Sequence, residues 1–204
     1  MHIEFIPQTE EKKTYAIRKA EQRVFVLHNA SGDYTFALEH PEAEVRVFAF
    51  YTATHEHRYA LRITQHHLSP RTLSSVSVRG ILSDTAALDY QGLIRIEEEA
   101  SGSAASQESR GLLLSNGASH ISQPALEILP EDVSCHHRAS VAPINEEAIT
   151  ALGLRGIDPQ SAKTLLTNGF LAASLEEMEK LLGASDELLH FRETLAQEVA
   201  AFAV

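Results

Sequence analysis

The chain has 204 residues, of which 44% are hydrophobic, and it carries a formal net charge of −11 with a pI near 5.4. The acidic balance argues against nucleic acid and anionic membrane surfaces as partners, because no basic stripe exists to neutralise phosphates. No apolar run is long enough for a membrane span, no apolar leader opens the chain, and a single cysteine cannot form an internal disulfide. We therefore expect a soluble, cytoplasmic protein.

The first part of the chain has the period-two pattern of β-strands. The opening segment 9–22 is either a helix or an extended lead-in. From about residue 23 to 130, apolar residues alternate in short segments that Gly, Pro, Asn and Asp punctuate, such as "RVFVLH", "EVRVFAF", "RYALRIT", "SSVSVRG", "GLIRIEE", "GLLLSN" and "ALEIL". The polar stretch 97–111 is interpreted as a mobile loop or a shallow corner between strands.

Many short strands without intervening helices predict an all-β body. On the pattern alone a sandwich, a barrel and a solenoid all remain open. The segments are unevenly spaced and show no clean internal repeat, which argues mildly against a regular propeller or hexapeptide helix. An irregular parallel β-helix is compatible with this spacing.

The pattern becomes helical after Asn145. A first helix with an acidic first turn can stop at "RG", residues 155–156. A second begins with Asp158 as N-cap and Pro159 at its first position. A third is predicted from the capping box Ser174…Glu177 to Gly183. A last amphipathic helix presents one apolar face made of Leu188, Phe191, Leu195, Val199 and Phe202.

The only cysteine stands in "DVSCHHRAS", residues 132–140. On a strand, Cys135 and His137 share a face about 6–7 Å apart, whereas His136 faces the opposite side. A thiolate and an imidazole are both suitable iron ligands. Two side chains do not complete a cluster site, so a partner subunit or a transient substrate has to supply the remaining ligands.

Residues on both sides of this cysteine resemble the C-terminal core of the SufB/SufD family of iron–sulfur cluster assembly scaffolds. That family has P-x-L-E-I, D-V-x-C-x-H-G-A, I-D-x-E and R-G-I stretches, and an upstream H-x-A-P-x-T-x-S segment. The D-V-x-C-x-H form resembles the SufD branch more than SufB. The matching positions here are Pro124, Leu126, Glu127, Ile128, Asp132, Val133, Cys135, His137, Ile144, Glu147, Arg155, Gly156, Ile157, Ala162 and Phe170, with His67, Pro70, Thr72 and Ser74 upstream.

The resemblance implies a right-handed parallel β-helix over residues 1–144, followed by a C-terminal α-helical region over 145–204. It implies a transient iron–sulfur cluster held by Cys135 and His137 at a subunit interface, and no permanently bound cofactor. The implied partners are a SufC-like ABC-type ATPase and either a SufB-like sister subunit or a second copy of this chain. The family helices that meet the ATPase correspond here to Arg155, Gly156, Ile157 and Phe170.

Several positions depart from the family pattern. The glycine after the motif histidine is Arg138, the aromatic pair before R-G-I is Thr150 and Ala151, and the serine before its arginine is Leu154. Family members also have an N-terminal helical region, and helices from about residue 174 exceed the pattern. We therefore expect a compact or divergent member.

Two other functions compete with the cluster scaffold. In one, Cys135 is a nucleophile with His137 as base, but no orienting group or oxyanion motif accompanies them, so we expect no enzyme. In the other, the chain is a β-helix interaction module that has lost cluster chemistry. The histidines His55, His57, His66 and His67 and the acids Glu127 and Asp132 are expected to be mainly structural or solvated.

Overall fold

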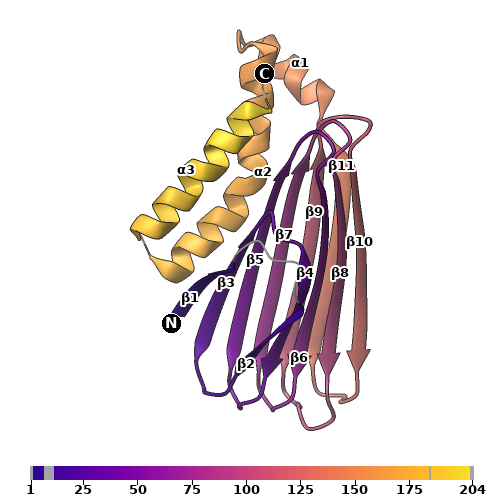
Figure 1. Ribbon diagram of the computed structural model, residues 1–204, viewed down its shortest axis with the longest axis vertical. Coiled ribbons are helices and arrows are strands. Elements are labelled where there is room, and N and C mark those ends of the chain that lie inside the picture. Colours follow the sequence, from indigo (N-terminus) through magenta and orange to yellow (C-terminus); the bar gives the residue numbers. More distant parts are fainter. Residues whose placement is uncertain (1, 7–11, 184, 203–204) are drawn as a thin grey trace.

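The protein is a flattened parallel β-solenoid with helices packed on one side, as the computed structural model shows (Figure 1). The structure describes residues 2–6, 12–183 and 185–202. One sheet, sheet A, has the strand order β1-β3-β5-β7-β9-β11, and the other, sheet B, has the order β10-β8-β6-β4-β2. The strands are β1 (His2–Ile6), β2 (Lys12–Ile17), β3 (Gln22–His28), β4 (Gly32–Leu38), β5 (Glu44–Ala53), β6 (Arg58–His67), β7 (Leu73–Leu82), β8 (Ala87–Ile96), β9 (Ala104–Leu113), β10 (Ser119–Ile128) and β11 (Ser134–Pro143).

Each strand pairs in parallel with the strand one coil further along the chain. In sheet A, Glu44 is in register with Leu73, Leu73 with Ala104, and Ala104 with Ser134. Each coil of this part therefore contains about 30 residues, counted along this register. The predicted parallel β-helix is confirmed. Its coils repeat in strand register, although the amino-acid sequence shows no clean repeat.

The core lies between the two sheets. Strand alternation turns every second side chain inward, and the largest of these are completely buried. Phe25, Tyr51, Phe36 and Leu61 come from both sheets and fill the first coils. The core is thus apolar and aromatic at the N-terminal end of the solenoid.

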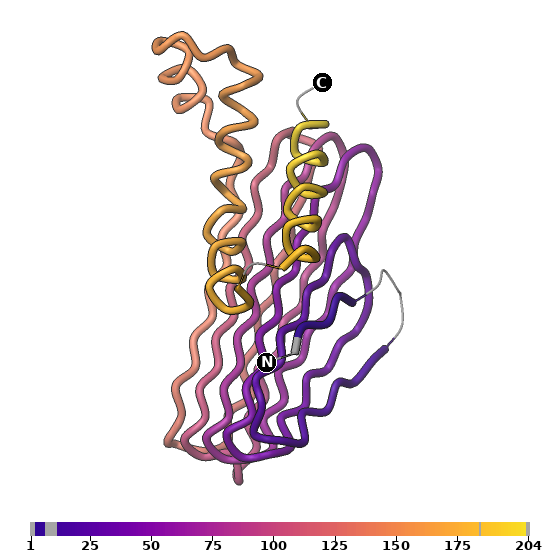
Figure 2. Tube along the Cα trace, turned by 90° about the vertical axis from the view of Figure 1, so that its left-hand side faces the viewer, coloured from indigo at the N-terminus to yellow at the C-terminus, as the bar shows by residue number. Residues whose placement is uncertain are grey.

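Three helices follow the last strand: α1 (Glu146–Gly153), α2 (Pro159–Leu182) and α3 (Asp186–Ala201). Helices α2 and α3 lie side by side over the outer face of sheet A, and α1 with the start of α2 projects beyond the strands (Figure 2). The predicted apolar face of the last helix is confirmed, because it packs on outward-facing residues of β3, β5 and β7. No helix of the described ranges is both long and apolar enough to cross a membrane.

The predicted helix starting at Ser174 is wrong, because α2 runs without a break from Pro159 to Leu182. Ser174 is buried inside this helix, and its hydroxyl lies 3.1 Å from the hydroxyl of Ser77 on β7. The expected N-cap at Asp158 and the expected helix end at Gly183 are both observed, as the two ends of α2. A capping-box pattern therefore also occurs in mid-helix, where a serine finds its partner on the sheet instead.

The stretch 97–111 is not a loop throughout, because β9 begins at Ala104. Its inward positions Ala105, Gln107 and Ser109 are small or polar and still buried. The opening segment, left open between helix and extended chain, contains strand β2, and β1 precedes it; residues 7–11 lie outside the described ranges. The strands therefore extend on both sides of the predicted apolar segments.

Two buried histidines hold polar positions in the interior. The two ring nitrogens of His67 lie 2.7 Å from the hydroxyls of Thr72 and Ser74. His120 Nε2 lies 3.1 Å from the Ser109 hydroxyl. Burial lowers the pKa of each of these two histidines to about 4, so both are neutral at neutral pH.

Candidate functional site at the C-terminal end of the solenoid

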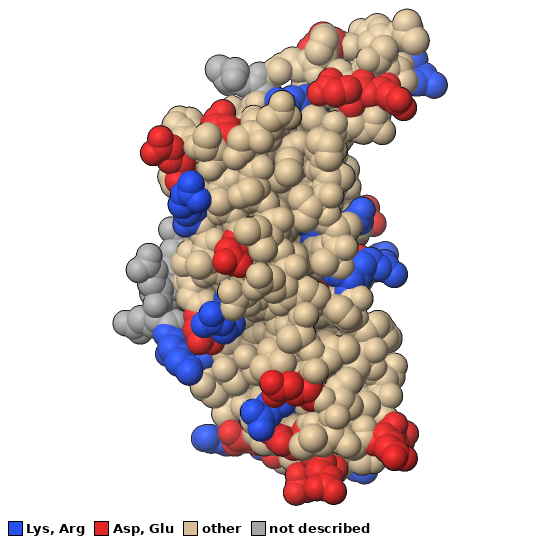
Figure 3. Space-filling view, turned by 90° about the vertical axis from the view of Figure 1, so that its right-hand side faces the viewer, with Lys and Arg blue, Asp and Glu red and all other residues tan. Residues whose placement is uncertain are grey.

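Strands β10 and β11 form the last coil, and each has a paired neighbour on one side only. The other edge of each strand presents backbone N–H and C=O groups that no described strand pairs. Figure 3 looks at the side of the molecule where these strands lie and shows sparse charge. Within the ten residues of each strand, the only Asp, Glu, Lys or Arg residues are Glu127 and Arg138.

Strand β11 places Cys135 and His137 on the inner side of this last coil. Cys135 is in register with Ala105, and His137 with Gln107, and both of these β9 residues are buried in the interior. Two residues of one strand that share a face have Cα atoms about 6–7 Å apart. The structure therefore brings the two predicted ligand residues to one face, and it turns His136 to the outside.

The two side chains differ in exposure. Cys135 is half-buried and packs on the small apolar cluster of Ile94, Ile96, Ala100 and Ala105, whereas His137 is exposed. Burial raises the pKa of the Cys135 thiol, and a hydrogen bond with the backbone of Ala105 opposes that effect only in part. The unliganded chain thus holds a neutral thiol beside an accessible imidazole, and metal binding would have to displace the thiol proton.

Apolar side chains surround this pair at the open end. Leu126, Ile128 and Val141 lie on the inner side of the last coil and remain 39%, 37% and 40% exposed. The sequence alone does not mark them as site residues, because they alternate with polar residues just as core residues of the inner strands do. Their position in the last coil is what leaves them uncovered.

The site is incomplete as a metal centre within one chain. Among the described residues, no group of three or more His, Cys, Asp and Glu side chains is arranged to hold a metal ion. Glu127 lies 3.8 Å from Arg95 and Asp132 is exposed, so neither acid contacts the Cys–His pair in the described structure. A thiol and an imidazole at an unpaired, weakly charged sheet end can contribute ligands only to a shared site.

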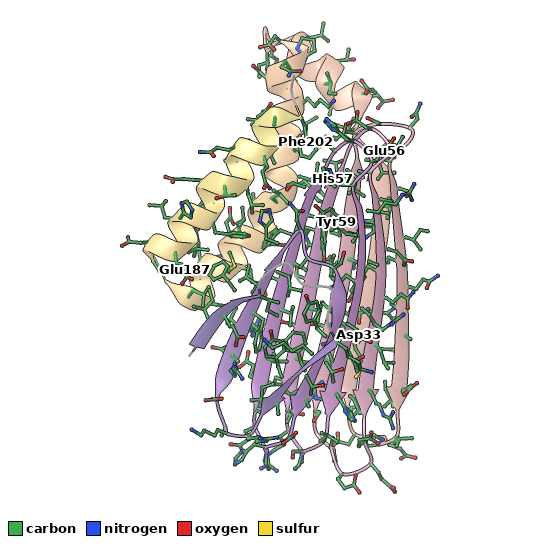
Figure 4. All side chains as sticks on the ribbon, viewed as in Figure 1. Asp33, Glu56, His57, Tyr59, Glu187 and Phe202 are labelled. Carbon is green, nitrogen blue, oxygen red and sulfur yellow. The ribbon has the colours of Figure 1, made fainter. Side chains whose placement is uncertain are left out.

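The other histidines singled out in the sequence, and His136, do not join this site. His67 is enclosed in its hydroxyl network, and His66 pairs with Glu97 at 2.8 Å. His55 is exposed in the turn between β5 and β6, where it has a positive φ of 58°. Figure 4 shows His57 beside Glu56 at one end of the strands. His136 faces a shallow hollow on the outside of sheet A together with Ser75 and Ser106.

The residues expected to contact an ATPase lie in the helical region, away from β11. Arg155 is exposed and donates to the carbonyl of Ala151 at 3.2 Å, and Gly156 has a φ of 86° in the turn between α1 and α2. Phe170 instead packs on the body, with the guanidinium of Arg110 5.8 Å from its ring centre. The most exposed large apolar side chain here is one that sequence analysis noted only as a departure: Leu154, at 87%.

These features define a class of protein: a parallel β-solenoid that carries a Cys–His pair at one open end. Among known families, the model described as "SUF system FeS cluster assembly, SufBD core domain" matches residues 21–170 of this chain. The chain belongs to this SufBD core-domain family, whose members take part in iron–sulfur cluster assembly.

Individual relatives agree with this placement. The chain is 34% identical over 112 residues to the iron–sulfur cluster assembly protein SufD of Bacillus subtilis, which covers 55% of this chain and 26% of that protein. It is 28% identical over 112 residues to SufB of the same organism, covering 55% of this chain and 24% of the relative. A third relative, SufD of Plasmodium falciparum, is 30% identical over 114 residues, which are 55% of this chain and 8% of that protein. The chain thus matches about a quarter of the length of its bacterial relatives, with higher identity to SufD than to SufB.

Proposed function

We propose that the chain is a scaffold subunit of SUF-type iron–sulfur cluster assembly, in which Cys135 and His137 donate ligands to a nascent cluster between two subunits. The observation that carries this proposal is the position of both side chains on the inner face of an unpaired, nearly uncharged last coil. The cluster is cargo and not a resident group. A cytoplasmic location fits the acidic composition and the single cysteine.

The second subunit is proposed to be a SufB-like sister or another copy of this chain, docked end to end on β10 and β11. An unpaired strand edge and exposed apolar side chains are what a second solenoid end would cover. Such a partner would also supply the missing ligands. Light scattering of the chain alone and with the sister protein distinguishes the two partners.

The helical region that projects beyond the strands is proposed to dock an ABC-type ATPase through Arg155, Gly156, Ile157 and the neighbouring Leu154. Phe170 would act indirectly, by fixing α2 on the body. Leu154→Asp should abolish co-purification of a SufC-like ATPase. The matched control is Leu189→Asp on α3, which changes a leucine that is also exposed, at 58%, on a different helix. Equal binding by both variants would place the ATPase elsewhere.

The ligand role is tested by complementation of iron–sulfur maturation in cells, with melting temperature measured beside it. We expect Cys135→Ser and His137→Ala each to reduce maturation severely while the melting temperature changes little. His136→Ala is the matched control, because strand alternation turns this neighbour outward. Full maturation by the folded double variant Cys135→Ser/His137→Ala would exclude the ligand role.

One observation favours a second candidate function, an interaction module without cluster chemistry. Cys135 is half-buried against apolar side chains and its pKa is raised, as in a packing cysteine. In that case Cys135→Ser lowers stability, and maturation falls only in proportion to the amount of protein. The same paired measurement therefore decides between the two functions.

A further inference from the structure

Three polar side chains inside the last coils have no hydrogen-bond partner among the described residues. They are Tyr90 on β8, Gln107 on β9 and Ser122 on β10, here called the inner polar layer. Tyr90 is 0% and Gln107 3% exposed, and the hydroxyl of Ser122 is buried. In Gln107 both the amide nitrogen and the amide oxygen lack a partner. Buried polar groups are nearly always hydrogen-bonded, so this group needs an explanation.

The fold brings these side chains together from both sheets. Ser122 is in register with Tyr90 in sheet B, so their side chains are neighbours on the inner face. Gln107 reaches across from sheet A toward Gly92. A Cβ atom at Gly92 would lie 2.0 Å from Gln107 Nε2 and 2.5 Å from the Tyr90 hydroxyl oxygen. The amide and the phenol therefore both reach the position that a Cβ atom of residue 92 would occupy.

Some other polar side chains of the same interior are paired within the protein, whereas Tyr15, Gln65 and His120 each also have one side-chain atom without a partner among the described residues. Both ring nitrogens of His67 contact hydroxyl groups, and the hydroxyl of the buried Tyr51 donates to the carbonyl of Ala30 at 2.5 Å. The inner polar layer is distinguished by neighbouring residues on three strands whose side-chain polar atoms all lack a partner. It offers amide donors, an amide acceptor and two hydroxyls, and burial raises the pKa of Tyr90, which keeps its proton on the phenol.

We propose that Tyr90, Gln107 and Ser122 bind ordered water inside the solenoid. Internal water typically makes about three hydrogen bonds to buried polar groups, and these three side chains offer that number of partners. The site would lie one strand behind His137, because Gln107 is its register partner on β9. The interior behind the Cys–His pair is then hydrated, whether or not the pair binds a cluster.

The test is a water–protein cross-relaxation NMR experiment on the full ¹⁵N-labelled chain. The side-chain amide protons of Gln107 should show a cross-peak to long-lived water, and Tyr90→Phe or Ser122→Ala should abolish or strongly weaken it. Tyr51→Phe is the matched control, since it removes the hydroxyl of another fully buried tyrosine whose partner is a carbonyl.

The proposal is overturned if the unmodified protein gives no water cross-peak at Gln107. It is also overturned if the cross-peak survives in both Tyr90→Phe and Ser122→Ala, or disappears equally in the control. None of these outcomes depends on maturation activity, so the result is separate from the proposed function.

Discussion

The two ends of the solenoid are finished differently. At the N-terminal end, the guanidinium of Arg23 lies 4.8 Å from the ring centre of Phe25 and pairs with Glu4 at 2.8 Å. On the other sheet, the Lys13 ammonium lies 4.6 Å from the Tyr15 ring centre. At the C-terminal end, two charged residues are spread over two ten-residue strands.

The difference in charge between the two ends bears on which end a partner could cover. Charged side chains over the terminal core discourage edge-to-edge pairing, because a partner would have to desolvate them. An end with Leu126, Ile128 and Val141 partly exposed has no such obstacle. We therefore propose that a partner docks at the C-terminal end, which also holds Cys135 and His137.

We expect the largest difference between the two ends in how their stability responds to acid. His67 and His120 have folded-state pKa values of about 4, below the ordinary 6.5, so the unfolded chain binds more protons between these values. The contribution of the two neutral histidines to the free energy of unfolding is complete above pH 6.5 and is lost as pH falls toward 4. At pH 5 the loss is about 2 kcal/mol for each histidine.

Hydrogen exchange at pH 7 and pH 5 checks this expectation. Amide protection should fall first in β6 to β10, where the histidines lie, and least in β2 and β3. Equal loss of protection at both ends would contradict it.

A charge introduced at the C-terminal end should oppose association there, as we expect the charged residues of the N-terminal end to do. Val141→Asp is expected to weaken subunit association by about 100-fold, since a carboxylate would be desolvated in the interface. Analytical ultracentrifugation measures the effect. Thr14→Lys, at an exposed position of β2, is the control at the other end and should leave association unchanged.

Glycine positions in the last coils should be intolerant of side chains. A Cβ at Gly111 would lie 2.3 Å from His120 Nδ1, so we expect Gly111→Ala to destabilise the fold by about 2 kcal/mol. Urea unfolding measures the change. Gly169 in α2 has no heavy atom within 4 Å of its Cβ position, and Gly169→Ala should instead stabilise by about 0.5–1 kcal/mol.

The smallest effect is expected when the charged side chain of Arg23 is removed from the N-terminal end. Arg23→Ala removes one cation–π contact and one partly exposed ion pair, with a loss of about 1 kcal/mol. The variant should also begin to self-associate, because the Phe25 ring loses its charged cover. If Arg23→Ala is less stable but shows no self-association, the charge of Arg23 does not protect this end against pairing with another chain.

The sequence predicted what depends on local pattern. The alternation around Val24 and Val47, the cap at Asp158 and the apolar face from Leu188 to Val199 all correspond to observed elements. The first part of strand β9, residues 104–110, could not be predicted in this way, because small and polar residues such as Ala105 and Ser109 fill its inner positions.

The candidate site was predictable only in part. The i, i+2 spacing of Cys135 and His137 places them on one face as soon as the segment is a strand. The sequence could not show that this strand lacks a neighbour on one side. Leu126 and Val141 look like core residues, and only the order of strands in the two sheets reveals that they are exposed.

The single thiol allows a direct test of the central idea that the C-terminal end faces a partner. The rate at which a maleimide labels Cys135 should fall at least tenfold when a SufB-like sister or a second copy associates, and Val141→Asp should restore the fast rate. Equal labelling rates in the isolated chain and in the confirmed assembly would contradict the account, because Cys135 would then lie outside the interface.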